Sequence, residues 1–96
     1  MAVPEQRTIS FAVVGPIARA DLPGLCERVC ALLAGSDAAV AYCDVRGVEP
    51  DAVTVDALAR LQLAARRRGC QVRLCGASDE LRSLVAFMGL ENVLAE

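Results

Sequence analysis

The stretch from Val40 to Gly69 constrains the fold of this chain more than any other, because a strand, an acidic corner and a helix follow one another within it. Its apolar start, Val40 to Cys43, ends at Asp44, and such a continuous run predicts a strand that is covered on both faces. Good helix formers then extend from about Thr54 to Arg68 and stop at Gly69, where a glycine cap belongs. A strand that leads into a helix in this way indicates an α/β fold.

The rest of the chain repeats this alternation of strands and helices. Strands are expected at Thr8 to Val14, Ala39 to Val45 and Gln71 to Cys75, helices from Asp21 to Gly35, from Thr54 to Arg68 and from Ser78 to Gly89, and a short strand or helical turn from Glu91 to Leu94. The stripe of the second helix that faces the core consists of Val55, Leu58, Leu61 and Ala65. Strands that alternate with helices of this length are joined by right-handed crossovers into a largely parallel sheet. We therefore expect one domain over residues 1–96, with its core at 8–95, that holds a small, mostly parallel sheet and three helices.

Composition limits the kinds of function that this chain can have. Its net charge of −2 argues against a protein that binds nucleic acid or an anionic membrane through its overall charge. The chain has no His, which removes the most frequent acid or base catalyst and the most frequent metal ligand. No basic and apolar leader opens the sequence, and no stretch of ~20 uncharged apolar residues occurs, so a cytoplasmic location without direct membrane insertion is expected.

The five cysteines are an odd number in a chain without a secretory leader, so a disulfide framework is not expected. They stand at positions 26, 30, 43, 70 and 75, and free Cys usually serves as a small buried hydrophobe. Cys26 and Cys30 would share a helix face at a spacing that suits a metal, but zinc would need two further thiols from separate elements. We therefore expect no metal and no cofactor, and we keep a thiol-based sensor at Cys26, Cys30 or Cys70 as an alternative.

Five segments together resemble the STAS domain over about residues 8 to 95. They are Asp44-Val45-Arg46-Gly47-Val48, the helix start at Asp51, the strand end Leu74-Cys75-Gly76, the run Ser78-Asp79-Glu80-Leu81-Arg82-Ser83-Leu84, and Met88-Gly89-Leu90. STAS domains occur as bacterial anti-sigma factor antagonists, as cytosolic tails of sulfate-type transporters and as the small subunit of lipid-transport ABC systems. The resemblance implies a STAS-like α/β fold and a protein that binds partners without chemistry of its own, and hence not an enzyme.

The start of the second helix departs from the STAS pattern. STAS antagonists commonly carry Asp-Ser-Ser-Gly there, and a kinase phosphorylates a serine of this motif to release the partner. Counting back from Gly69 matches Asp51 to the acid of the motif, whereas counting forward from Asp44 places Thr54 at the second serine. A one-residue gap is tolerated in a loop but would turn a helix by about 100°, so we favour the first alignment. Thr54 is then an N-terminal cap or first-turn residue, and phosphorylation of Thr54 remains the alternative.

The resemblance also implies that a partner binds at the start of this helix and at the loop before it. The expected contact residues are Arg46, Gly47, Asp51, Thr54, Val55 and Leu58. The favoured partner is an anti-sigma factor or its kinase, for a regulator that lacks the usual phosphorylatable serine. The alternative partner is a transport ATPase, for a small cytosolic STAS subunit of an ABC-type lipid transport complex. An exposed sheet edge at residues 8–14, where the usual N-terminal strand of the family is truncated or absent, would support a homodimer.

Overall fold

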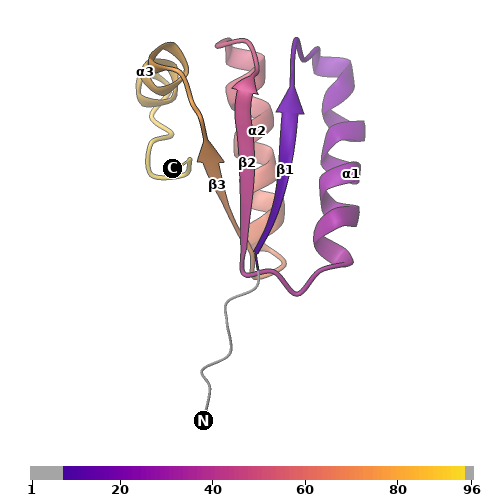
Figure 1. Cartoon of the computed structure of the whole chain (residues 1–96). Coiled ribbons are helices and arrows are strands. Elements are labelled where there is room, and N and C mark those ends of the chain that lie inside the picture. The colour runs from indigo at the N-terminus through magenta and orange to yellow at the C-terminus, as the bar shows by residue number, and fades with distance from the viewer. Residues whose placement is uncertain (1–7, 95–96) are drawn as a thin grey trace.

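Three parallel strands form the sheet of this protein, and the computed structural model describes residues 8–94 of the chain (Figure 1). In chain order the elements are β1 (Thr8–Val14), the short 3₁₀ helix η1 (Arg19–Asp21), α1 (Leu22–Ala34), β2 (Val40–Gly47), α2 (Ala52–Arg66), β3 (Gln71–Cys75) and α3 (Asp79–Phe87). A helical turn follows α3, in which the Leu94 amide donates a 2.8 Å hydrogen bond to the Leu90 carbonyl. The predicted class, a small parallel sheet with three helices, is confirmed. The expected domain limits at 1–96 and 8–95 extend beyond the described residues.

The order of the strands leaves one face of the sheet without a covering helix. The strands lie side by side in the order β1-β2-β3, so both crossovers step in the same direction across the sheet. Because such crossovers are right-handed, α1 and α2 lie on the same side, and Figure 1 shows α2 behind the sheet, α1 beside β1 and α3 at the β3 edge. The prediction that β2 is covered on both faces is therefore wrong: Tyr42 is 40% exposed, whereas Ala41 beside it is fully buried.

The core lies between the covered face of the sheet and the two helices behind it. Leu58 and Leu61 of α2 are fully buried and are among the largest side chains in this core. Small fully buried residues fill the space between α2 and the sheet: Ala41, Cys43, Ala57 and Ala65. Because these side chains are short, α2 packs closely against the strands and serves as the central helix of the fold.

Local hydrogen bonds fix both ends of α2. At the start, Asp51 is the N-cap, and its Oδ1 accepts a 2.8 Å hydrogen bond from the Thr54 amide. At the end, Gly69 has a φ of +74°, and the Cys70 amide donates a 2.9 Å hydrogen bond to the Ala65 carbonyl, which is a Schellman cap. The helix therefore begins two residues before the expected Thr54, because Asp51 caps it, and the predicted glycine cap at Gly69 is confirmed.

The two edges of the sheet differ in whether their outer backbone groups have hydrogen-bond partners. The β3 edge is closed by Gln62 of α2, whose side chain is fully buried. Gln62 Nε2 donates to the carbonyls of Val72 at 2.8 Å and Val93 at 2.9 Å, and Oε1 accepts a 2.8 Å bond from the Val72 amide. By contrast, among residues 8–94 β1 pairs with β2 alone, so the outer edge of β1 carries unpaired N–H and C=O groups. The exposed edge expected at residues 8–14 is present in this part of the chain.

Candidate interaction surface at the carboxyl end of β2

An ion pair between Asp44 and Arg46 stands on the uncovered face of the sheet. The two residues are two positions apart on a strand, so their side chains project from the same face. Arg46 Nη2 donates to Asp44 Oδ2 at 2.7 Å, and Arg46 Nε donates to Asp44 Oδ1 at 3.0 Å. The backbone amide of Arg46 donates a further 3.0 Å bond to Asp44 Oδ1. Such bidentate pairing holds the guanidinium in one orientation.

Arg46 also lies over the backbone at the end of β3, and this contact needs a glycine. Gly76 has a φ of +73°, a left-handed conformation that favours glycine. A Cβ atom on Gly76 would lie only 2.7 Å from Arg46 Cδ, so any larger residue would displace the arginine. The bare backbone of Gly76 thus provides the surface on which the aliphatic part of Arg46 lies.

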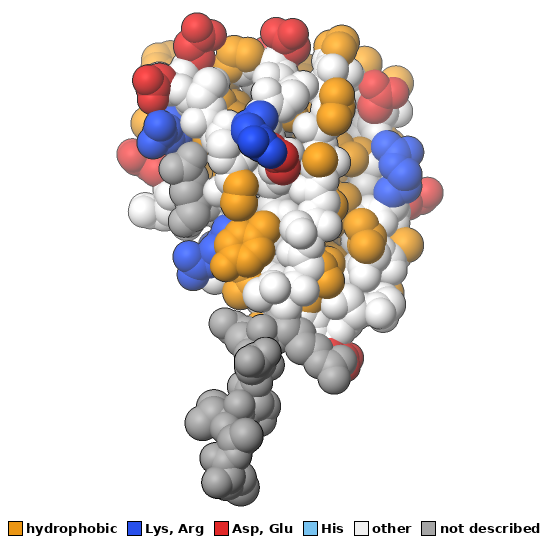
Figure 2. Space-filling view, in the orientation of Figure 1, with side chains coloured by type: hydrophobic (Ala, Val, Ile, Leu, Met, Phe, Trp, Pro, Cys, Tyr) orange, Lys and Arg blue, Asp and Glu red, His pale blue; other side chains and the backbone are white. Residues whose placement is uncertain are grey.

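The Asp44–Arg46 pair borders a shallow hollow of about 290 Å³ on the uncovered face, and we call this hollow with its ion pair the sheet-face site. It is lined by Ser10, Tyr42, Asp44, Arg46, Cys75 and Gly76. The register brings them together, because Ser10 lies opposite Tyr42 and Asp44 lies opposite Cys75. Figure 2 views this face, where a cation and an acid lie among hydrophobic and uncharged side chains. A fixed charge pair in neutral surroundings suits recognition of polar groups on a protein partner.

Hydrogen bonds from Arg46 lower the pKa of Asp44 to about 2. The side-chain bonds from Arg46 are the largest cause, and the bond from the Arg46 amide comes next. The pKa of Asp44 is depressed, so the pair is complete above the ordinary Asp pKa near 3.8 and is lost as the pH falls through about 2. Asp44 therefore positions Arg46 and exchanges no proton near neutral pH.

Removal of the guanidinium is expected to raise the pKa of Asp44. Arg46→Ala deletes the side-chain bonds but keeps the bond from the amide at position 46, so the pKa should rise from about 2 toward 3.8 without reaching it. The chemical shift of the Asp44 carboxyl carbon in an NMR acid titration measures this change. Arg60→Ala, which removes an exposed cation elsewhere, serves as the control and should leave the Asp44 pKa unchanged. An Asp44 pKa that stays near 2 in Arg46→Ala would contradict the assigned cause.

The expected contact residues divide into two groups in the structure. Arg46, Gly47 and Asp51 are exposed, so a partner can reach them. Thr54, Val55 and Leu58 are each 0% exposed, because α2 turns this side toward the sheet. These three side chains are therefore not accessible to a partner in the folded chain.

Thr54 carries a buried hydroxyl without a hydrogen-bond partner. Its amide donates to Asp51, which makes Thr54 a first-turn residue, one of the two roles that the favoured alignment allows. Its Oγ1 atom is buried and makes no hydrogen bond in the described part of the chain. A kinase could reach this oxygen only if the start of α2 opened.

Replacement of Thr54 by Val is expected to raise the free energy of unfolding by about 1 kcal/mol. An unpaired buried hydroxyl costs about 1–3 kcal/mol, and Val removes this hydroxyl while it keeps nearly the same shape. Urea unfolding measures this change. Thr54→Ser is the matched control: it keeps the hydroxyl, loses the methyl group and should lower the free energy of unfolding. A destabilised Thr54→Val variant would show that the hydroxyl has a partner.

The cysteines occupy different environments. Cys43 and Cys70 are buried, and burial raises the pKa of Cys43 to about 12 and also raises that of Cys70. Cys26 and Cys30 are half-buried, and Cys75 is exposed in the sheet-face site, so the prediction of a buried hydrophobe is wrong for Cys75. Within residues 8–94, no three His, Cys, Asp or Glu residues gather closely enough to hold a metal ion. In the same range, no helix has the length and the apolar character needed to cross a membrane.

Sequence reasoning missed part of the sheet-face site. No local signal for the ion pair was present, because the expected strand ended at Val45 and Arg46 lay beyond it, whereas β2 extends to Gly47. Nor did a signal exist for Tyr42 as an exposed residue or for Gly76 as the support of Arg46. Both roles depend on which face of the sheet stays uncovered and on the pairing of β2 with β3.

A solved structure that is similar to this chain is that of a sulfate transporter family protein from Wolinella succinogenes. The two superimpose with a TM-score of 0.64 at 24% sequence identity, over 92% of this chain and 75% of that chain. At this level of identity the likeness shows the fold, which is STAS-like as predicted. No family model and no curated protein matches the chain.

Proposed function

We propose that this chain is a non-enzymatic STAS-type protein that binds another protein, as a regulator of the anti-sigma factor antagonist kind. The observation that carries the proposal is that Arg46 is both exposed and held in one orientation. Its side chain is 76% exposed and yet is held by several hydrogen bonds to Asp44. An arginine that is already ordered loses little conformational entropy on binding, and arginines are frequent in the energetic centres of protein interfaces.

The other polar groups near this surface have roles that fit binding better than catalysis. Asp51 caps α2, and Asp44 holds Arg46 with a pKa of about 2. The nearest buried thiol on β2, Cys43, has a pKa of about 12. A general acid or base works best with a pKa near the working pH, and these values lie far from neutrality. The support for a binding role is therefore electrostatic as well as structural.

The burial of Thr54 bears on how such a regulator would be controlled. Its hydroxyl is 0% exposed in the folded chain, so a kinase cannot reach it. We propose that the protein either acts constitutively or is switched by something other than phosphorylation at this position. Phosphate on Thr54 in protein isolated from the native host would overturn this part of the proposal.

The same observation favours a second candidate function. A small cytosolic subunit of an ABC-type lipid transport complex needs no phosphorylatable residue at the start of α2, and its partner would be a transport ATPase. The buried Thr54 is compatible with that role. The identity of the protein that meets Arg46 and Gly47 separates the two candidates.

Photo-crosslinking in the native host tests both candidates. A photoreactive residue replaces Gly47, where a Cβ atom would make ordinary contacts with Val14 at 3.6 Å and with the Val13 carbonyl oxygen at 3.9 Å. A matched control carries the same photoreactive residue at Arg67, the C-cap of α2. Capture of an anti-sigma factor or its kinase from position 47 alone would support the regulator, and capture of a transport ATPase would support the second candidate.

A double substitution then tests the surface itself. Arg46→Ala removes the guanidinium, and Asp51→Asn removes a charge while keeping an equally good N-cap. The two substitutions together should abolish capture of the partner from position 47 without changing the stability of the fold. Equal capture from positions 47 and 67, or capture that survives the double substitution, would show that the partner binds elsewhere.

A further inference from the structure

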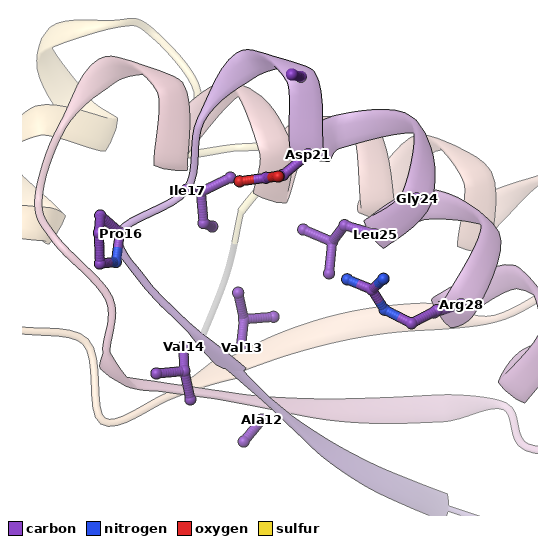
Figure 3. A pocket seen from close by; sticks show the side chains of 10 residues that line it. Ala12, Val13, Val14, Pro16, Ile17, Asp21, Gly24, Leu25 and Arg28 are labelled. Atoms are coloured by element: carbon purple, nitrogen blue, oxygen red, sulfur yellow. The ribbon is translucent and has the colours of Figure 1, made fainter.

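A groove runs between the free edge of β1 and the first half of α1 (Figure 3). It encloses about 430 Å³ and shares no lining residue with the sheet-face site. Its apolar walls are Val13 and Val14 of β1, Ile17 of the following loop and Leu25 of α1. Val14 is 73% exposed. The groove is therefore open, apolar and bordered by unpaired strand backbone.

Apart from a register shift between Ala12 and Val14, the β1 edge lacks the features by which proteins usually protect a free strand. Its seven residues, Thr-Ile-Ser-Phe-Ala-Val-Val, include no charge and no proline, and several are β-branched or aromatic. The β3 edge shows the contrast, because the buried Gln62 satisfies Val72 there. Such an uncharged free edge can accept an extended segment as a further strand, a mode of recognition in which backbone hydrogen bonds provide affinity.

The charges of the groove indicate the chemistry of that segment. Figure 3 shows Arg28 reaching from α1 into the space between Leu25 and Val13. The guanidinium lies near Gly24, where a Cβ atom would lie at an ordinary contact distance of 3.6 Å from Arg28 Nη1. Asp21, the residue before α1, already accepts a 3.0 Å hydrogen bond from the Ala18 amide. Within residues 8–94, Arg28 takes part in no ion pair, so its guanidinium is a positive charge that is available to a ligand.

We propose that the β1–α1 groove binds an extended segment of another protein, which pairs with the β1 edge and places an acidic side chain against Arg28. The apolar walls receive the alternate side chains of that segment, as the two-residue period of a strand requires. The groove shares no lining residue with the sheet-face site, although Ser10 belongs to β1 and lines the sheet-face site. Substitution of Arg28 should therefore leave binding at the sheet-face site intact.

The test selects peptides from a random library displayed on phage, with the full-length chain as bait. We expect enrichment of sequences that alternate apolar residues and carry one acid. A synthetic peptide of the selected sequence should perturb the NMR amide signals of Thr8 to Val14 and should bind Arg28→Glu about tenfold more weakly. The matched control Arg67→Glu, on the far end of α2, should bind the peptide normally. A peptide whose acid is replaced by Lys should regain affinity for Arg28→Glu.

Backbone methylation tests the strand pairing separately from the charge. Only every second amide of an added strand faces the edge, so N-methylation of one alternate set should abolish binding and methylation of the other set should be tolerated. Failure of the selection, equal affinity for Arg28→Glu, or equal effects of the two methylation sets would overturn the proposal. It would also be overturned if the β1 amide signals of the free protein shifted on dilution, which would assign the edge to a second copy. Contacts between residues 1–7 and β1 in the free protein would likewise overturn it, because they would assign the groove to the chain itself.

Discussion

Gln62→Leu is expected to lower the free energy of unfolding by about 3 kcal/mol or more, since each buried polar group left without a partner costs about 1–3 kcal/mol. Leucine has nearly the volume of glutamine, so little cavity forms and the loss reports on hydrogen bonds. The substitution leaves the Val72 amide and the carbonyls of Val72 and Val93 without their partner. Against a total stability of about 5–15 kcal/mol for a small domain, this loss is large. Urea unfolding measures it.

Amide hydrogen exchange shows whether the loss of stability in Gln62→Leu arises at the β3 edge. The amide of Val72 should exchange much faster in Gln62→Leu than in the parent chain, relative to amides between β1 and β2. Leu63→Ala is the matched control: Leu63 follows Gln62 in α2, is 51% exposed, and its truncation should change the free energy of unfolding by only about 0.5 kcal/mol. Equal stability of Gln62→Leu and the parent chain would mean that the β3 edge does not depend on this side chain.

The elements of the fold were predictable from the sequence because their signals are local. The strand at Thr8–Val14 has the expected limits, and so does the strand at Gln71–Cys75. The end of β2 was not predictable: it lies at Gly47 instead of Val45, because the Gly15 amide donates a 3.0 Å bond to the Gly47 carbonyl across the sheet. A bond between strands far apart in the chain leaves no mark in a local pattern.

The surface was predictable only in part, because two kinds of reasoning gave conflicting answers for α2. The helical period placed Val55 and Leu58 in the stripe that faces the core, and the structure confirms this. The resemblance to STAS domains placed the same residues in the contact surface, although both are 0% exposed in the folded chain. Gln62 shows a different limit: a polar residue on the buried side of a helix gives no hint that it will meet the edge of β3. Where the helical spacing of apolar residues conflicts with a motif carried over from a family, the spacing is the better guide to which residues are buried.

Leu58→Ala is the prediction that separates these two interpretations of α2. Leu58 is 0% exposed and lies in the core, so its truncation should lower the free energy of unfolding by about 2–5 kcal/mol. The folded fraction of the variant should still bind the partner that is captured from position 47 with the parent affinity, because Leu58 lies beneath the surface. Urea unfolding gives the stability, and a titration corrected for the unfolded fraction gives the affinity.

Two comparison variants make this result decisive. Arg46→Ala should show the opposite behaviour, with a stability close to that of the parent chain and a weaker affinity, because Arg46 is 76% exposed. Arg60→Ala, at an exposed position of the same helix as Leu58, should change neither quantity appreciably. A Leu58→Ala variant that kept the parent stability but lost affinity would place Leu58 in the interface. The packing of α2 against the sheet would then be wrong, and with it the assignment of the partner surface to Arg46, Gly47 and Asp51.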